Sequence, residues 1–225
     1  MKRVGGKLAA YGVLAHVLVA ALLAIAVVAI FVLAPTEATM GDAQRIVYVH
    51  VSVAWVALLC FLVMAVGGVA YLVRRDLGCD HWARAAAELG WLCSTLTLAT
   101  GSLWAHSAWN TWWTWDPRLA ATFVLWVIYS GCLIVPAGLE DPHRRARVGA
   151  VLAILGLLDL PMVVMATRLF RGVHPASPQM EPSMRAVLLV SIAAFTALFA
   201  VLLVRRRNQL HLQSLLAPPE QRSEI

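Results

Sequence analysis

Residues 46–73 read IVYVHVSVAWVALLCFLVMAVGGVAYLV, a run of 28 residues without any Asp, Glu, Lys or Arg. A helix that crosses the hydrocarbon core of a bilayer needs about 20 mostly apolar residues. Within lipid, the backbone polar groups of a segment have to be bonded inside the segment itself, which favours a helix. The run therefore predicts a membrane-spanning helix, and with it the fold class of the whole chain.

Five more apolar stretches flank this run, at about residues 12–34, 85–105, 119–139, 148–167 and 184–204. Over the whole chain 61% of the residues are hydrophobic and 13% are charged, whereas soluble domains carry about 25% charged residues. The sequence thus predicts an all-α, polytopic membrane protein with six transmembrane helices. The first stretch is too long for the core of a signal peptide, so we interpret it as a retained span. The expected organisation is a six-helix transmembrane domain over residues 1–207 and a cytoplasmic C-terminal tail over residues 208–225.

The Lys and Arg residues of the loops predict the orientation of the helices, because basic loops stay in the cytoplasm. Thirteen of the 18 lie on one side of the predicted topology and five on the other. Both termini are therefore predicted to be cytoplasmic (N-in/C-in), and the loop between the third and fourth spans is predicted to face outward. The sequence has no P-loop, no G-x-G-x-x-G and no C-x-x-C, so it indicates neither a nucleotide-driven engine nor a zinc site. Nucleic acid is not an expected partner, since the basic residues are scattered.

That outward loop is rich in tryptophan. It reads WAHSAWNTWWTWDPR from Trp104 to Arg118 and contains five of the nine tryptophans of the chain. One or two tryptophans are ordinary at a membrane interface, where they form an aromatic belt. Five within twelve residues favour a surface for a flat, apolar ligand, and they are Trp104, Trp109, Trp112, Trp113 and Trp115.

Three histidines, His50, His106 and His174, lie at or near the same predicted surface. Two imidazoles from distant parts of a chain can converge on one haem iron, for which imidazole is a common axial ligand. Arginines on this side offer partners for the two haem propionates, and the candidates are Arg45, Arg118, Arg168 and Arg171. Each residue also has an ordinary explanation: a histidine can be structural, and an arginine can reach lipid headgroups. The residues alone therefore leave both interpretations open.

The motif WNTWWTWDPRL at residues 109–119 resembles the signature W-G-T-W-W-x-W-D-x-R-L of tryptophan-rich, haem-handling membrane proteins. Within this CcmC/CcmF/CcsA superfamily the chain is similar to the cytochrome c maturation protein C (CcmC) family. The similarity extends over nearly the whole chain: six spans, RIVYVHV at the start of the second span, GSLWAHSAW before the core motif, and LDLP in the fifth span.

This resemblance implies a site and partners. It implies that His50 and His174 are the axial ligands of the iron of haem b (Fe-protoporphyrin IX), with Arg45 and Arg118 as the best candidates for propionate contacts. It implies that the tryptophan-rich loop, which ends at Asp116, presents the haem edge to the haem chaperone CcmE for covalent attachment. The implied assembly includes the small single-span subunit CcmD and the ABC-type subunits CcmA and CcmB. The implied location is the bacterial inner membrane with the haem site facing the periplasm, and the implied activity is haem transfer of a lyase-like kind rather than conventional enzymatic turnover.

The chain departs from the family pattern at several positions. Asn110 stands where the loop usually has Gly, and we expect the turn to survive because Asn tolerates a left-handed backbone. Ala105 also replaces a usual Gly. Before the second histidine, where the family often has a pair of tryptophans, this chain has Leu169 and Phe170. His106 occupies a variable position, so we interpret it as a residue that does not ligate iron.

Three acids within or beside the spans need separate explanations. Asp116 precedes Pro117, and an acid followed by a proline in the first turn favours an N-cap for the fourth span. A pairing with Arg118, a loop hydrogen bond, or a role in fixing the shape of the loop for docking of the chaperone can coexist with this cap. Asp159 lies deep in the fifth span, where a carboxylate has to be paired or protonated, and we favour a hydrogen-bonded acid at a bend before Pro161 over a polar element on a haem path. Glu88 lies near the cytoplasmic end of the third span, within reach of water.

Three further functions stay open from the sequence. A channel that exports haem would need a polar route, and within the spans the sequence offers only the sparse polar points His16, Glu88 and Asp159. A structural subunit of an ABC-type complex would use the tryptophans as a docking belt. A cytochrome c synthase of the same superfamily is less favoured, because such proteins are usually larger and carry more histidines within the spans.

Overall fold

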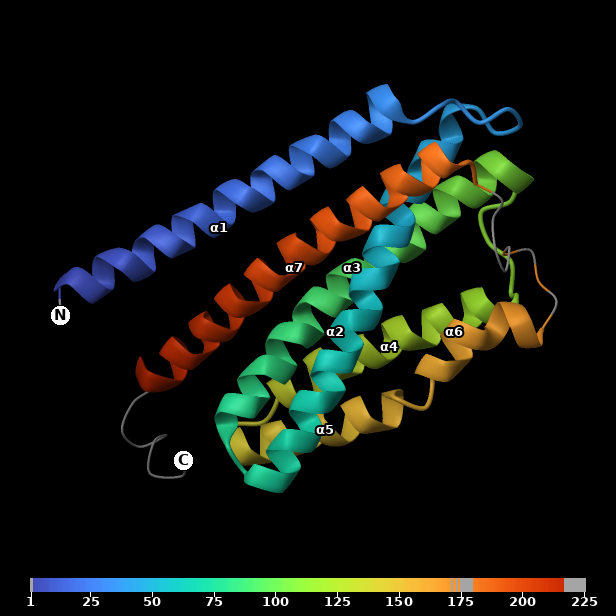
Figure 1. Cartoon of the computed structure of the whole chain (residues 1–225). Helices are drawn as coiled ribbons and strands as arrows, with labels where there is room; N and C mark the ends of the chain where they lie inside the picture. Colours follow the sequence, from blue (N-terminus) through green and yellow to red (C-terminus); the bar gives the residue numbers. More distant parts are fainter. Residues whose placement is uncertain (1, 171, 173, 175–179, 217–225) are drawn as a thin grey trace.

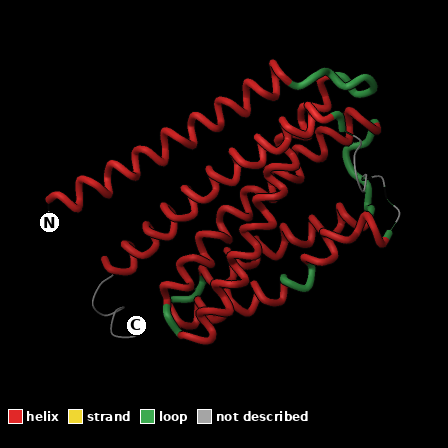
Figure 2. Tube along the Cα trace, viewed as in Figure 1, coloured by secondary structure: helices red, strands yellow, loops and turns green. Residues whose placement is uncertain are grey.

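The structure is a computed structural model that describes residues 2–170, 172, 174 and 180–216, with side chains except those of residues 2–11 and 167. Within these residues the chain is all-α and has no β-strand, so the predicted fold class is confirmed (Figures 1 and 2). The helices are α1 (Lys2–Val28), α2 (Ile46–Arg74), α3 (Leu77–Trp109), α4 (Pro117–Ala137), α5 (Pro142–Gly156), α6 (Leu160–Leu169) and α7 (Pro182–Leu216). A π-turn, η1 (Ala29–Leu33), extends α1, and a 3-10 turn, η2 (Asp42–Arg45), precedes α2.

Five helical segments among the described residues are long and apolar enough to cross a bilayer. They are Gly12–Leu33, Asp42–Arg74, Pro117–Ala137, Pro142–Ala166 and Pro182–Leu216. The remaining predicted span, residues 85–105, lies within the 33-residue helix α3, where Ser, Thr, Gly and Trp dilute the apolar residues. The chain is therefore a multi-pass membrane protein, and the count of six spans stays a prediction.

Helices α2 and α3 form a long hairpin at the centre of the bundle, and α4, α5 and α7 pack around this pair (Figure 1). Two adjacent glycines on α2 let neighbouring helices approach closely. A Cβ on Gly67 would lie 3.1 Å from the Cβ of Ala83 on α3, and one on Gly68 would lie 3.1 Å from the Cα of Ala150 on α5. Small residues at helix contacts are typical of membrane bundles, in which close van der Waals packing drives association.

The two ends of the bundle are built differently. One end, called here the loop end, contains residues 34–45, residues 110–116 and the described residues between α6 and α7 (Figure 1). The other, called here the hairpin end, contains the turns at 75–76 and 138–141, together with the start of α1 and the last turns of α7. All three segments that the sequence predicts to face outward therefore share the loop end.

The fifth predicted span is broken rather than continuous. Helix α5 stops at Gly156 and α6 starts at Leu160, so the bend expected at LDLP is present. Asp159 lies at this break, but its side chain does not cap α6, and its Oδ2 is buried without a hydrogen-bond partner among the described residues. The bend is thus confirmed, whereas the hydrogen bond that we expected to hold the carboxyl is not found there.

Helix α7 extends further than the sequence suggested. It continues through residue 207 to Leu216, and Leu210 within the extension is buried. The first part of the segment expected to form a C-terminal tail is therefore helical and packed, while residues 217–225 lie outside the described chain. A separate tail stays a prediction for those residues.

Candidate functional site

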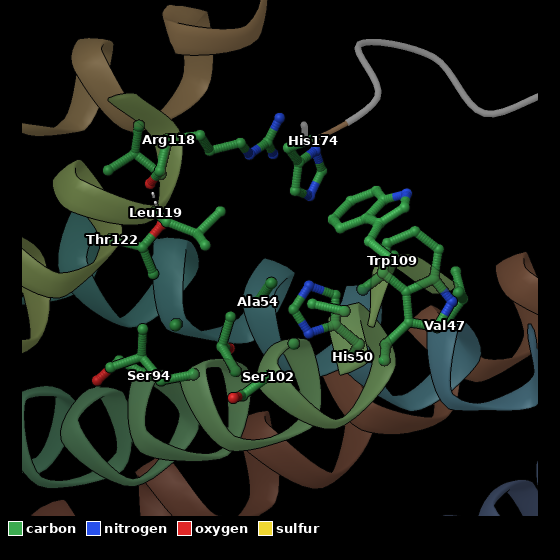
Figure 3. A pocket seen from close by; sticks show the side chains of 18 of the residues that line it. Val47, His50, Ala54, Ser94, Ser102, Trp109, Arg118, Leu119, Thr122 and His174 are labelled. Carbon is green, nitrogen blue, oxygen red and sulfur yellow. Dashed lines mark hydrogen bonds between the residues drawn. The ribbon is translucent and has the colours of Figure 1, made fainter. Parts of the chain in front are cut away.

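A cavity of about 400 Å³ opens at the loop end, between α2, α3, α4 and the segment that follows α6. Its volume lies within the range of roughly 300–1,000 Å³ that is usual for small-molecule sites. Both histidines predicted to ligate iron line it: His50 from α2 and His174 from the segment between α6 and α7. In Figure 3 their rings point into the space between them, with Trp109 at its edge and Arg118 beside His174.

His50 is held on the wall of the cavity by α3. Its Nδ1 lies 3.0 Å from Oγ1 of Thr100, and the Thr100 hydroxyl donates its own proton to the carbonyl oxygen of Leu96 at 2.7 Å. The Thr100 oxygen therefore accepts from Nδ1–H, which leaves Nε2 of His50 as the unprotonated nitrogen. Gly101 makes room for the ring, because a Cβ there would lie 2.9 Å from Cε1 of His50. An imidazole fixed at one nitrogen and open at the other is the usual arrangement of a metal-ligating histidine.

Asp116 is the N-cap of α4, as the sequence predicts. Its Oδ1 accepts from the Leu119 backbone N–H at 2.9 Å, and Pro117 takes the first helical position. Its Oδ2 accepts from the backbone N–H of His174 at 3.4 Å. One carboxylate thus contacts both the start of α4 and the segment that carries the second histidine.

The tryptophans of the loop divide into two groups. Trp104, Trp109 and Trp113 are half-buried and line the cavity, and Trp104 and Trp109 pack edge to face with ring centroids 4.8 Å apart. Trp115 is 75% exposed and does not line the cavity, while Trp112 lines it and is still 55% exposed. The loop therefore presents indole rings both to the cavity and to its surroundings.

The backbone of this loop is held by two features. Asn110 ends α3 in the left-handed conformation, with φ at 53°, as expected for an Asn in place of Gly. The hydroxyl of Ser102, about two helical turns before the end of α3, donates to the Trp112 carbonyl oxygen at 2.6 Å. The loop is thus tied back onto α3, and its rings keep defined positions.

The predicted arginine partners are separated by the structure. Arg118 lines the cavity, but Arg45 does not. Arg45 instead turns to the end of α1, where it donates to the carbonyl oxygens of Ile30 and Ala34, and it pairs with Asp42 through Nε at 2.9 Å. These contacts satisfy carbonyls that a helix C-terminus leaves open. Arg168 is exposed and does not line the cavity, and Arg171 lies outside the described residues.

His106 lies beside the cavity rather than on its wall. Its exposed ring stacks on Trp112, with centroids 4.0 Å apart and planes at 7°. This contact packs His106 against the loop, and its interpretation as a residue that does not bind iron stays a prediction.

Several residues in or beside the cavity carry no signal in the sequence. Thr100 and Gly101 lie in an apolar stretch, and only the register of α3 against α2 brings them to His50. Gln44 is 3% exposed, lines the cavity and has no hydrogen-bond partner for either amide atom within the described chain. The only local sign of Gln44 is its place in the turn before a span. In the sequence alone, a buried Gln at such a place cannot be told from a surface Gln.

The residues present fit a haem. Cavity-lining donors that are buried without a partner in the described chain include Nε1 of Trp104, Nε1 of Trp113 and Nε2 of Gln44. Buried donors are normally paired, so they point to a ligand that brings acceptors of its own. No three His, Cys, Asp or Glu side chains of the described residues are grouped to hold a bare metal ion. Two imidazoles instead suit a metal whose other ligands come from a porphyrin ring.

Fold and site together define a multi-pass helical membrane protein with a two-histidine, tryptophan-lined cavity at one end.

Known proteins agree with this class. The family model described as "Heme exporter protein C" matches residues 4–217. The chain is 35% identical over 186 residues to heme exporter protein C of Bradyrhizobium diazoefficiens. The aligned region covers 79% of this chain and 71% of the relative. It is 32% identical over 183 residues to the protein of the same name in Escherichia coli K12, covering 79% and 75%. The chain therefore belongs to the heme exporter protein C (CcmC) family, and the resemblance seen in the tryptophan motif is confirmed.

Proposed function

We propose that this protein binds haem b between His50 and His174 and presents it, during cytochrome c biogenesis, to the haem chaperone CcmE. The observation that carries the proposal is the convergence of these two histidines, far apart in sequence, on one apolar cavity lined by tryptophans. Membership of a family whose relatives are named heme exporter protein C supports haem as the cargo.

Each part of the site has a task in this proposal. Nε2 of His50, left open by Thr100, ligates the iron from one side and His174 from the other. Arg118, on the cavity wall beside His174, holds a propionate (Figure 3). Bound haem supplies the vinyl edge to which CcmE becomes attached. Trp112 and Trp115, the exposed rings of the loop, offer the surface on which CcmE docks, since aromatic side chains dominate many protein interfaces.

The proposed setting is the bacterial inner membrane, with the loop end at the periplasmic face and both termini in the cytoplasm. The distribution of Lys and Arg supports this orientation, because twelve of the 16 within the described residues fall on the side of the hairpin end. CcmD, CcmA and CcmB are the proposed membrane partners, in keeping with an ABC-type complex. Helices with exposed apolar faces, such as α1 with Val13, Val17 and Ile25, are available to lipid or to these subunits.

Visible absorption of the purified, haem-loaded protein tests the proposal. We expect the wild type to show six-coordinate, low-spin haem, and His50→Ala and His174→Ala each to lose that spectrum. His106→Ala is the matched control, because this histidine lies at the same end but outside the cavity lining. Unchanged spectra in both ligand variants would refute the assignment, and a complex without any haem would favour a purely structural subunit.

Export of haem through the protein is the second candidate function, favoured by the word "exporter" in the names of its relatives. Of the polar points in the spans, Glu88 is already engaged, since both its oxygens accept from Arg206 at 2.5 and 2.8 Å. Haem flux into sealed vesicles that contain only this protein would support export. Binding at the loop end without flux would support presentation.

A further inference from the structure

The two histidines of the cavity are held in different ways. His50 belongs to the long helix α2, and its ring is oriented by Thr100. His174 belongs to no helix, so its position depends on contacts of the segment between α6 and α7. A ligand has to be kept within about 0.5 Å of its working position to bind a metal well. Something outside that segment therefore has to hold His174.

The carboxylate of Asp116 is in contact with this segment at the histidine itself. Oδ2 accepts from the His174 backbone N–H at 3.4 Å, while Oδ1 accepts from the Leu119 N–H at 2.9 Å. Hydrogen bonds with an ionised acceptor are stronger than neutral ones. Because Oδ1 is held by the first turn of α4, the carboxyl group that contacts His174 has a fixed position.

A second, independent observation places the segment against the same carboxylate. A Cβ on Gly172 would lie 3.0 Å from Oδ2 and 3.1 Å from Cγ of Asp116. The backbone two residues before the histidine thus packs so closely on the carboxyl group that an added methyl group would make one of them shift. Asp116 therefore contacts two described residues of this segment, Gly172 and His174, and not a single amide alone.

We propose that Asp116 is a positioning residue for the second iron ligand: it holds His174 through its backbone, so that the tryptophan-rich loop and this ligand form one unit. The proposal rests on the haem-binding function above and adds a role for the acid that closes the tryptophan motif. A displacement of the loop, for example by a docking partner, is then transmitted to His174. His50, held by α2 and α3, stays in place.

Asp116→Ser and Asp116→Asn test this role. Serine is a good N-cap, so it keeps the bond to Leu119, but its single oxygen cannot also serve His174. Asparagine keeps the size, and only one of its two terminal atoms can accept. Asp141→Ser is the matched control, because Asp141 caps α5 at the hairpin end in the same way, through the His143 and Arg144 N–H groups.

The first readout needs no haem. Hydrogen exchange of the His174 amide, measured in the haem-free protein, should become about 2- to 10-fold faster in both Asp116 variants, which is the range expected for one lost hydrogen bond. The second readout is the spectrum: part of the low-spin haem should convert to the five-coordinate, high-spin form, with His174→Ala as the reference for full conversion. Asp141→Ser should match the wild type in both.

The proposal would be overturned if the Asp116 variants showed the wild-type rate of His174 amide exchange and the wild-type haem spectrum. It would also be overturned if amide exchange became faster while the haem spectrum stayed unchanged. A wild type without a His174-dependent spectrum would instead refute the haem function, while the exchange measurement would still test the contact. If the Asp116 variants lose helical content, Gly172→Ala tests the proposal instead, because it keeps the Asp116 cap of α4 and displaces only the segment that carries His174. We expect the haem spectrum of Gly172→Ala to change in the same direction as in the Asp116 variants, but by less. An unchanged spectrum would overturn the proposal.

Discussion

Histidines gather at both ends of the bundle, but they are surrounded differently. At the hairpin end, Nδ1 of His143 lies 3.0 Å from the Tyr71 hydroxyl, and His81 packs against His211 with ring centroids 5.7 Å apart. None of these three histidines lines the cavity at the loop end, whereas His50 and His174 both do. The surroundings of an imidazole, and not the number of histidines, therefore separate a structural group from a candidate ligand.

The same contrast holds for the charged residues. At the hairpin end Glu88 and Arg206 form a bidentate ion pair between α3 and α7, which ties two helices together. At the loop end Arg118 lines the cavity next to His174. Charges at one end therefore hold the bundle, and we expect a charge at the other end to meet a ligand. Variants that should act on only one end test this contrast, and the largest effect on haem binding is expected at Arg118.

Arg118→Gln should lower the affinity for haem by about 10- to 150-fold, since a hydrogen bond to a charged group contributes about 1.5–3 kcal/mol. Arg45→Gln is the matched control: Arg45 is committed to carbonyls at the end of α1 and does not line the cavity. Its haem affinity should stay within about twofold of the wild type, because no ligand contact is lost. Haem titration in detergent measures both, and equal losses in the two variants would contradict the assignment of Arg118.

Gly101→Ala should lower haem affinity by about tenfold, because overpacking costs about 1–3 kcal/mol. The added methyl group would lie 2.9 Å from Cε1 of His50, so the ring has to move from its place beside Thr100. Gly131→Ala on α4 is the control, since a Cβ there meets no atom within 4 Å. Both variants gain the same helix propensity, and a haem titration that fails to separate them would show that the position of the His50 ring does not limit binding.

Local signals predicted part of this site. The acid and proline at Asp116 and Pro117 predicted the cap of α4, and Asn110 predicted a left-handed helix end, because both depend on neighbouring residues only. The tryptophan motif predicted the family. The pairing of Thr100 with His50 depends on the register of two helices, for which the sequence has no local sign.

The behaviour of Arg45 shows the same limit from the other side. It lies at the loop end, with the other segments predicted to face outward, but its side chain turns to α1 rather than to the cavity. The open carbonyls at a helix end bind a guanidinium as well as a ligand in the cavity could. Which of the two Arg45 contacts depends on how the end of α1 lies against the turn before α2. The sequence cannot rank such contacts before the helices are placed.

Trp115→Ala should leave haem affinity within about twofold of the wild type but lower transfer to CcmE by about tenfold or more, as for an exposed aromatic hot spot. Trp113→Ala is the counterpart, because its ring lines the cavity and packs against Trp115 with centroids 5.5 Å apart. We expect Trp113→Ala to lower haem affinity itself. Haem titration and covalent loading of CcmE, measured on the same preparations, separate the two effects; loss of affinity in Trp115→Ala would contradict its assignment to docking.

Asp80→Asn should leave haem binding unchanged and alter only the pH dependence of stability. Asp80 lies at the hairpin end and is 4% exposed, and burial raises its pKa to about 6, against the opposing effect of Arg84, Arg145 and His143. A raised pKa means that the folded protein binds the proton more tightly, so this contribution to stability is present below about pH 4 and is lost as the pH rises through about 6. The difference from the ordinary value of 3.8 is about 2 pK units, or at most about 3 kcal/mol.

Asparagine resembles the protonated acid and has no proton to lose, so the stability of Asp80→Asn relative to the wild type should rise between pH 4.5 and pH 7.5. Thermal unfolding of the haem-free protein in detergent measures this difference. Asp76→Asn is the control, because Asp76 is exposed, lies at the same end and caps α3 with an oxygen that Asn also has. A pH trend shared by both variants would show that burial of Asp80 is not its cause. A changed haem spectrum in Asp80→Asn would show that the two ends of the bundle are coupled, because no residue of this cluster lines the cavity.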